Sequence, residues 1–109
     1  MPRFGTRSKS RLHTCDERLQ DLFKEVVKHF DCSVLEGHRG KEKQNAAYER
    51  GNSKLKFPKG KHNRMPSIAV DVIPYPIDWE DRDRMHYFAG FVLGIAKKRG
   101  LKIRWGGDW

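Results

Sequence analysis

Apolar residues recur every three or four positions in two stretches of the chain, which is the pattern of helices with one buried face. In the first stretch, Thr14 and Glu17 form a capping box, so a helix is predicted from about 15 to 29. In the second, Asp78 or a neighbouring residue caps a helix predicted from about 79 to 99. The positions expected to be buried are Leu19, Leu22, Phe23, Val26, Val27 and Phe30 in the first helix, and Met85, Phe88, Ala89, Val92, Ile95 and Ala96 in the second.

Three shorter stretches, 32–36, 67–73 and 101–105, are predicted to be strands because they are rich in β-prone residues and bounded by Gly or Pro. Side chains alternate between the two faces of a strand. In the stretch 67–73, Asp71 therefore lies on the face opposite the branched apolar side chains. We expect Asp71 to point away from the more apolar face.

A third helix is predicted at 41–50, where Gly51 ends it, and the segment 52–66 is predicted to be an exposed loop. The predicted elements alternate between helix and strand, which indicates an α+β fold in which a small antiparallel sheet packs with helices. A chain of 109 residues with 37% apolar content fills one small core, so we expect a single domain over 1–109.

The chain is strongly basic, with a net charge of +9. This charge predicts attraction to a polyanion. The candidates are nucleic acid, anionic lipid and an acidic cell-wall polymer. No zinc-finger, RNP or helix-turn-helix signature supports nucleic acid. The sequence has no run of about 18 apolar residues and no apolar stretch behind its basic start. We therefore expect no membrane span, no secretory signal and synthesis in the cytoplasm.

The two cysteines, Cys15 and Cys32, do not form a CxxC pair. A disulfide between them is geometrically possible. Without a secretory signal, two reduced and partly buried thiols are the favoured interpretation.

His62 and Asp71 stand at either end of a turn that leads into the strand predicted at 67–73. Neutral imidazole and carboxylate are both good zinc ligands, and a catalytic zinc takes three protein ligands and a water. The pair is thus half of a metal site, and its third ligand is not obvious from the sequence. A surface histidine near a strand aspartate is the alternative interpretation.

Six segments, in this order, carry a resemblance to a known family: Gly37–Arg39, Gln44–Tyr48, Gly51–Lys54, Lys61–Asn63, Pro66–Trp79 and Arg104–Trp109. They resemble the zinc peptidases that comprise D-Ala-D-Ala carboxypeptidases and L-alanyl-D-glutamate endopeptidases, which cut the peptide stems of peptidoglycan and include many phage endolysins. The resemblance extends over nearly the whole chain from about residue 12. It implies a Hedgehog/DD-peptidase-like fold, a zinc cofactor and metallopeptidase activity.

The resemblance also implies roles for five residues. His62 and Asp71 match the first two zinc ligands of the family. Arg39 matches the arginine that lies over the substrate carbonyl, where a fixed cation stabilises developing negative charge. Ser67 and Gln44 match positions near the bound substrate and are predicted to bind it, although Gln44 could instead support the site or lie on the helix surface.

The resemblance breaks off at the third ligand. In the family, an acidic residue and a histidine lie on a strand beyond the Trp-Gly-Gly-Asp-Trp segment, where they serve as general base and third zinc ligand. The sequence ends at Trp109, so we expect a domain without this strand, weak zinc binding and little hydrolysis unless a second chain completes the sheet. His38 and Asp108 are the substitutes to consider, although His38 and its neighbour Arg39 should point to opposite faces.

The sequence is consistent with two alternative functions. The first is a zinc-dependent peptidoglycan peptidase, of endolysin or D,D-carboxypeptidase type, that acts on stem peptides at the bacterial cell wall after release from the cytoplasm. The second is a non-catalytic basic protein that binds the cell wall or nucleic acid through the basic stretch 54–64. Hydrolysis that a chelator abolishes would favour the first, and DNA binding with a steep salt dependence would favour the second.

Overall fold

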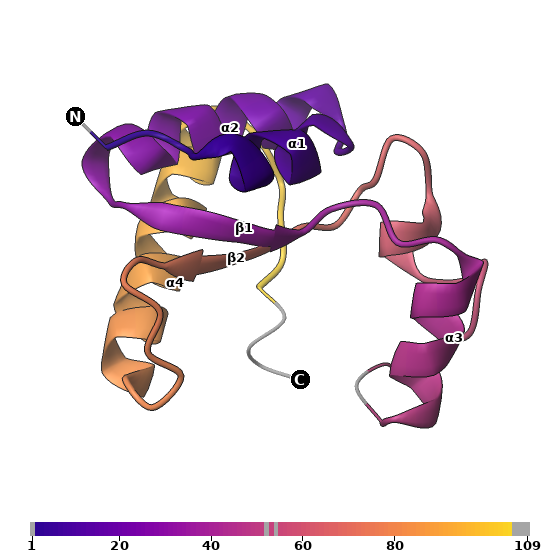
Figure 1. Cartoon of the computed structure of the whole chain (residues 1–109). Helices are drawn as coiled ribbons and strands as arrows, with labels where there is room; N and C mark the ends of the chain where they lie inside the picture. The colour runs from indigo at the N-terminus through magenta and orange to yellow at the C-terminus, as the bar shows by residue number, and fades with distance from the viewer. Residues whose placement is uncertain (1, 52, 54, 106–109) are drawn as a thin grey trace.

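The computed structural model describes residues 2–51, 53 and 55–105. In chain order these residues form α1 (Thr6–His13), α2 (Glu17–His29), β1 (Cys32–Glu36), α3 (Lys41–Glu49), the 3-10 turn η1 (Lys61–Asn63), β2 (Asp71–Pro74) and α4 (Arg82–Lys98). β1 and β2 pair in a two-stranded antiparallel sheet. Helices α1 and α2 lie together along the sheet, α4 lies near one of its ends, and α3 stands beyond the other end (Figure 1). The predicted α+β class with a small antiparallel sheet is confirmed.

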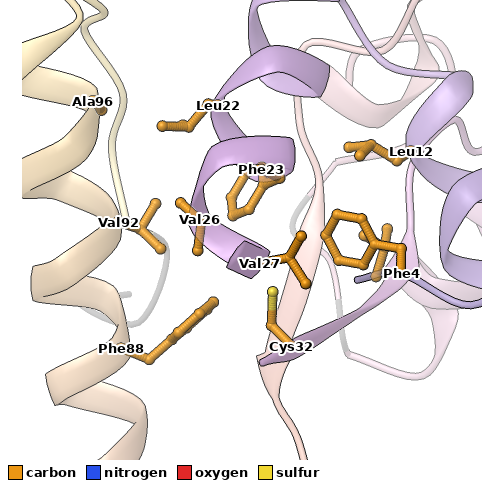
Figure 2. Packing of buried hydrophobic residues seen from close by; sticks show 11 residues of the cluster. Phe4, Leu12, Leu22, Phe23, Val26, Val27, Cys32, Phe88, Val92 and Ala96 are labelled. Atoms are coloured by element: carbon orange, nitrogen blue, oxygen red, sulfur yellow. The ribbon is translucent and has the colours of Figure 1, made fainter. Parts of the chain in front are cut away.

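The core forms where α2 and α4 pack against each other and against the sheet (Figure 2). The helical periodicity predicts the buried faces of both helices correctly. The core residues of these elements are Leu22, Phe23, Val26 and Val27 of α2, Phe88, Val92 and Ala96 of α4, and Cys32 and Val34 of β1. Four of the expected core residues, Leu19, Phe30, Met85 and Ile95, are only partly buried. Each fully buried Leu, Val or Phe contributes about 1.5–3 kcal/mol, so this cluster is the main source of stability.

Helix α2 begins behind a different cap from the one the sequence predicts. Its N-cap is Asp16, whose carboxylate accepts a hydrogen bond of 2.9 Å from the Arg18 backbone N–H. The predicted capping box of Thr14 and Glu17 is therefore wrong. The Thr14 hydroxyl instead donates to the carbonyl of Arg11 at the end of α1. The prediction fails because Thr14 is the C-cap of a preceding helix, α1, so α2 can begin only after Asp16.

Helix α4 begins at Arg82, three residues later than predicted. Its N-cap is Asp81, whose carboxylate accepts from the Arg84 backbone N–H at 3.1 Å. Asp78 lies in the turn before the helix, where its side chain accepts from the Glu80 backbone N–H.

None of the helices in the described part of the chain, α4 included, is long and apolar enough to cross a membrane.

Helix α1 is not predicted from the sequence, because Leu12 is its only buried residue. Polar side chains, rather than an apolar stripe, attach this helix to the rest of the protein. The Ser8 hydroxyl accepts from the Val34 backbone N–H at 3.0 Å, and the Arg11 guanidinium donates to the Val34 carbonyl at 3.1 Å. These bonds satisfy backbone groups that an open strand edge would otherwise leave unpaired. Helix α1 therefore covers the free edge of β1.

Among the described residues, the strands are fewer than predicted and the second is shorter. β1 has the predicted bounds, but β2 begins only at Asp71 rather than at Ser67. The backbone N–H of Ser67 donates to the Thr14 carbonyl at 2.8 Å, and its carbonyl accepts from the Asp16 N–H at 2.7 Å. Ser67 is thus bound to the turn between α1 and α2 instead of to β1. The predicted strand 101–105 is also wrong, because these described residues form no strand.

A β-bulge shapes the end of the sheet. Val34 of β1 lies opposite Val72, whereas Glu36 lies opposite Asp71, so β1 holds one extra residue between these two pairs. A bulge bends its strand and redirects the side chains beside it. Here it brings Glu36, and the turn that follows β1, to the start of β2.

The predicted helix at 41–50 is α3, and Gly51 follows it with a φ of 78°, the left-handed conformation that favours glycine. The segment 52–66 is largely exposed among its described residues, as predicted, but it is not a loop throughout. It contains η1, and Asn63 of this turn is buried. Its side chain makes hydrogen bonds that an exposed loop would lack.

Cys15 and Cys32 are both free and buried, as the reduced-thiol interpretation predicts. Burial and, to a smaller extent, the nearby charge of Asp31 together raise the pKa of Cys32 to about 12. The Cys32 thiol is therefore neutral at physiological pH and behaves as a small apolar residue of the core.

A substitution of Gly37 tests how closely the turn after β1 packs against α1. A Cβ here would overlap the Arg11 carbonyl oxygen and the Thr14 hydroxyl and would lie 2.9 Å from Cys15 Sγ. We expect Gly37→Ala to lower the free energy of unfolding by about 1–3 kcal/mol, the usual cost of overpacking, in denaturant titrations. Gly94→Ala is the control, because a Cβ on this residue of α4 meets open space and should raise stability by about 0.5–1 kcal/mol. Equal effects of the two changes would contradict this packing.

Candidate functional site

The bulged end of the sheet brings together three of the residues singled out in the sequence. Asp71 is the first residue of β2, Arg39 lies in the turn between β1 and α3, and His62 lies in η1. The backbone N–H of Arg39 donates to the His62 carbonyl at 2.7 Å, which fixes the two segments side by side. Residues from three separate segments therefore meet at one place on the surface.

Asp71 lies between the other two side chains. Its Oδ1 is 3.6 Å from His62 Nε2, and its Oδ2 is 3.8 Å from a terminal nitrogen of Arg39. The Asp71 side chain is 51% exposed, whereas those of His62 and Arg39 are 16% and 14% exposed. Asp71 is thus the solvent-facing member of the group, in agreement with the strand alternation that places it away from the apolar face.

The His62 ring is held by the turn after β1. Its Nδ1 lies 2.8 Å from the Gly37 carbonyl oxygen. A carbonyl can only accept a hydrogen bond, so Nδ1 carries the proton of the neutral ring, and the Nε2 lone pair faces Asp71. This tautomer, with the second ring nitrogen bound to a carbonyl, is the usual arrangement of a metal-binding histidine.

The pKa of His62 reflects opposing influences. Burial lowers it, but the Asp71 carboxylate and the Gly37 carbonyl raise it by more, so the pKa is raised above its ordinary value of 6.5. The positive charge of Arg39 lowers it in turn. In the metal-free protein, the protonated ring is therefore stabilised mainly by Asp71.

The Arg39 guanidinium is held by three partners. Its Nε donates to the Glu36 carboxylate, one terminal nitrogen donates to Gln44 Oε1 at 3.0 Å, and the other faces Asp71. The side chain is mostly buried and its orientation is fixed by these contacts. It therefore presents a fixed positive charge next to the His62 and Asp71 pair.

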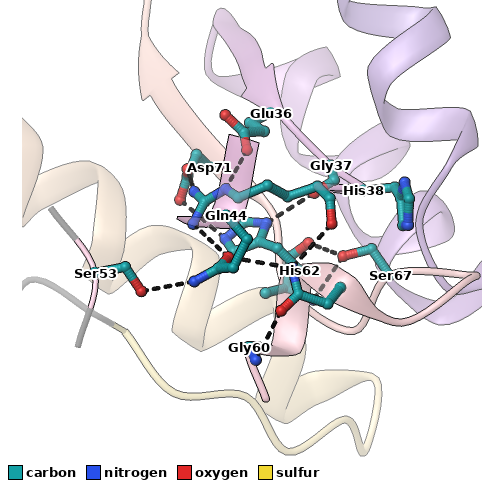
Figure 3. Close-up of polar contacts among 12 residues, drawn as sticks. Glu36, Gly37, His38, Gln44, Ser53, Gly60, His62, Ser67 and Asp71 are labelled. Carbon is teal, nitrogen blue, oxygen red and sulfur yellow. Dashed lines mark hydrogen bonds and ion pairs between the residues drawn. The ribbon is translucent and has the colours of Figure 1, made fainter. Parts of the chain in front are cut away.

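Ser67 and Gln44, the predicted substrate-binding residues, are 0% and 1% exposed. The Ser67 hydroxyl donates to the Ala69 carbonyl at 2.6 Å. Gln44 Nε2 donates to the Ser53 hydroxyl at 2.8 Å, as Figure 3 shows. In this structure both side chains are occupied inside the protein, so a direct contact with a substrate would require each to leave these bonds. Their role in substrate binding stays a prediction.

No third metal ligand joins His62 and Asp71 in the part of the chain that the structure describes. These residues contain no group of three or more His, Cys, Asp or Glu that could hold a metal ion. The His38 ring points away from Asp71 in Figure 3, although residues 38 and 39 lie in a turn and not in a strand. Asp108, the other substitute considered, lies outside the described residues.

The remaining histidines do not lie at this site. His13 is the last residue of α1, and His29 ends α2, where its ring lies 3.7 Å from a Glu25 oxygen. His86 is exposed on α4, where its ring packs edge-on against Trp105. Each is an exposed residue of a helix.

Three residues of the site were given no role in the sequence analysis. Glu36 binds Arg39, the Gly37 carbonyl orients His62, and Asn63 binds the Arg39 carbonyl at 2.9 Å. Glu36 stands three residues before Arg39, and Asn63 directly follows His62. Gly37 and Asn63 lie in segments that carry the family resemblance, whereas the only signal for Glu36 is its position near Arg39, because the sequence does not reveal the bulge that brings Glu36 to Asp71.

The His62 and Asp71 pair could hold a divalent cation. Both available atoms, Nε2 and Oδ1, lie on the same side of the cluster and are 3.6 Å apart. Two ligands at about 2.1 Å from one tetrahedral ion would be about 3.4 Å apart, so the pair needs little movement to bind one ion. The nitrogen and oxygen donors suit zinc, and the mostly buried Arg39 adds a cation that could stabilise an anionic group beside it.

Comparisons with known proteins place the chain among the peptidases, a class of hydrolases. The model of one protein family, described as phage L-alanyl-D-glutamate peptidase, matches residues 1–109, and the chain belongs to this family. The chain is also similar in structure to the L-Ala D-Glu endopeptidase ChiX of Serratia marcescens, with a TM-score of 0.78 and 25% sequence identity over 99% of this chain and 82% of that chain. No curated protein matches the chain. The family resemblance found in the sequence is therefore confirmed.

Asp71→Asn tests the charge balance at His62. The change removes the carboxylate that raises the pKa of His62. Burial and Arg39, which lower this pKa, and the Gly37 carbonyl, which raises it, remain. We expect the pKa of His62 in the metal-free protein to fall, measured by NMR titration of the ring signals in the presence of a chelator. Asp83→Asn, a change of an exposed acid on α4, is the control and should leave the titration unchanged. An unchanged His62 pKa in Asp71→Asn would show that the two side chains do not interact.

Proposed function

We propose that the protein is a zinc-dependent peptidase that cleaves the L-alanyl–D-glutamate bond in the stem peptides of peptidoglycan. The observation that carries this proposal is the convergence of His62, Asp71 and Arg39 at the bulged end of the sheet. Membership of the phage L-alanyl-D-glutamate peptidase family and the similarity to an L-Ala D-Glu endopeptidase support the choice of bond. They favour this bond over the D-Ala-D-Ala bond, which the sequence left open.

His62 Nε2 and Asp71 Oδ1 would hold the zinc ion. Bound zinc would polarise the scissile carbonyl and lower the pKa of a bound water. The Gly37 carbonyl keeps the His62 ring in the tautomer that can bind a metal, and the exposed position of Asp71 opens this side of the pair to a ligand from solvent. A third protein ligand and a general base would come from residues outside the described part of the chain, such as Asp108, or from a second chain.

Arg39 would stabilise the negative charge that develops on the carbonyl oxygen during attack. Its guanidinium is fixed by Glu36 and Gln44 before any substrate binds, so no reorganisation is needed when the charge appears. Preorganised donors of this kind are typically worth about 10²- to 10³-fold in kcat. The high positive charge of the protein would then favour approach to an anionic polymer. Given the family, we propose that this polymer is the bacterial cell wall rather than nucleic acid.

Zinc dependence gives the first test. A soluble peptide that contains an L-alanyl–D-glutamate bond should be cleaved by the zinc-loaded protein, and a chelator should abolish the cleavage. Zinc titration by calorimetry should show one weak site that is lost in His62→Ala, because one of the two described ligands is gone.

His86→Ala is the matched control, since His86 is an exposed histidine of α4 and not part of the cluster. It should keep both zinc binding and cleavage. Cleavage that persists in the chelator, or zinc binding that is the same in His62→Ala as in the unmodified protein, would refute the proposed metal site.

The role of Arg39 gives a second test. Arg39→Lys keeps the positive charge but cannot reach Glu36, Gln44 and Asp71 together, because lysine lacks the planar guanidinium. We expect kcat for the peptide to fall about 10²- to 10³-fold while zinc still binds. Arg18→Lys, a change of an exposed arginine that pairs with Asp16, is the control and should leave kcat unchanged. A normal kcat in Arg39→Lys would remove Arg39 from the mechanism.

A further inference from the structure

Helix α3 and the segment that follows it contribute little to the apolar core. Figure 1 shows α3 apart from the sheet and from the other helices. The only buried residues of α3 are Gln44 and Ala47, and the core cluster includes neither. Polar contacts must therefore fix this part of the chain, which carries His62, relative to the sheet, which carries Asp71.

Gln44 is the centre of these polar contacts. Its Oε1 accepts from a terminal nitrogen of Arg39 at 3.0 Å and from Asn63 Nδ2 at 3.1 Å. Its Nε2 donates to the Ser53 hydroxyl at 2.8 Å and to the Leu55 carbonyl at 2.5 Å. An amide side chain has two acceptor and two donor positions, so Gln44 uses all four. These four bonds join Gln44 of α3 to Arg39, to Asn63 of η1 and to the segment between α3 and η1.

Asn63 completes the connection. Its Nδ2 also donates to the Arg39 carbonyl at 2.9 Å, and its Oδ1 accepts from the Gly60 backbone N–H at 2.8 Å. It directly follows His62, whose carbonyl accepts from the Arg39 N–H. Arg39 is therefore bound at its backbone N–H, its carbonyl and its side chain by a single polar cluster.

We infer that Gln44 and Asn63 are positioning residues, which fix the Arg39 guanidinium relative to His62 and Asp71. This inference rests on the proposed function, in which Arg39 acts on the substrate. Gln44 is suited to the task because its amide oxygen is neutral: it holds the guanidinium in place without cancelling the charge that Arg39 needs. Without it, the side chain would be held only by the Glu36 and Asp71 carboxylates, and the Asp71 oxygen is 3.8 Å away.

The test compares two neighbouring amides of α3. Gln44→Met keeps a side chain of similar length but removes all four hydrogen bonds. We expect it to lower kcat for the peptide about 10- to 100-fold with little change in KM, because a misplaced supporting group costs rate rather than binding. Asn45→Ala is the matched control. Its amide oxygen accepts from the Phe57 N–H at 3.1 Å and so also binds the segment after α3, but it contacts neither Arg39 nor Asn63.

A spectroscopic readout separates this inference from the proposed function. The Nε–H signal of Arg39 in the metal-free protein should shift or broaden in Gln44→Met and stay in place in Asn45→Ala, whether or not the protein cleaves the peptide. A lack of zinc-dependent cleavage by the unmodified protein would refute the proposed function alone. Equal kcat values and identical Arg39 signals in the two variants would refute the positioning role.

Asn63→Ala decides the question if Gln44→Met does not fold, as judged by circular dichroism and thermal unfolding. This change removes the donor to the Arg39 carbonyl and one of the two donors to Gln44 Oε1. We expect the same direction of change in kcat and in the Arg39 signal. A folded Asn63→Ala protein with an unmoved Arg39 signal and normal kcat would overturn the inference.

Discussion

The antiparallel pairing of β1 with β2, with its one extra residue in β1, is the contact on which both the core and the site depend. Apolar residues of both strands pack against α2 and α4, while the open edge of β1 is closed by α1. The bulge ends the regular pairing and sets Glu36 opposite Asp71. A change that shifted this register by one residue would move the side chains of β2 to the opposite faces, so it would expose apolar residues and bury Asp71.

The protein thus has two regions that are stabilised by different forces. Burial of apolar side chains holds α2, α4 and the sheet together, and this attraction has little directionality. Directional hydrogen bonds from Gln44 and Asn63 hold α3 and the segment around His62. The candidate site lies where these regions meet, with Asp71 on the sheet and His62 on the other side. Its geometry therefore depends on the amides of Gln44 and Asn63 as well as on the apolar core.

The parts of the structure that follow from local periodicity were predictable, and those that depend on long-range polar contacts were not. The buried faces of α2 and α4 follow from helical spacing, and the outward position of Asp71 follows from strand alternation. Helix α1 has no apolar stripe to reveal it, because Ser8 and Arg11 bind Val34, a residue distant in the sequence. The predicted strand at 101–105 fails for the opposite reason: Leu101 and Ile103 are apolar because they pack against the core, not because they pair.

The site residues show the same division. The pattern around His62, Asp71 and Arg39 marked them in the sequence, and the structure brings all three together. Glu36 was not marked, since only the bulge places it beside Arg39. Gln44 and Ser67 were marked, but sequence alone could not show that both are buried. A motif identifies which residues a family retains near a site, whereas burial and hydrogen bonding decide whether a residue faces the ligand or supports one that does.

The electrostatic balance at His62 links the metal-free and the proposed metal-bound states. The Asp71 carboxylate that raises the pKa of His62 attracts a proton to the same Nε2 position where a metal ion would bind. Because the folded pKa is raised, the stabilising charge pair is fully formed below the ordinary pKa of 6.5 and is lost as pH rises through the folded value. A metal needs the neutral ring, so its affinity should grow over the range in which this pair dissociates. Above that range no proton lies between His62 and Asp71, and the fixed positive charge of Arg39 lies 3.8 Å from the Asp71 carboxylate. In the proposed function, the arrangement that favours a proton at low pH would thus favour a divalent cation at high pH.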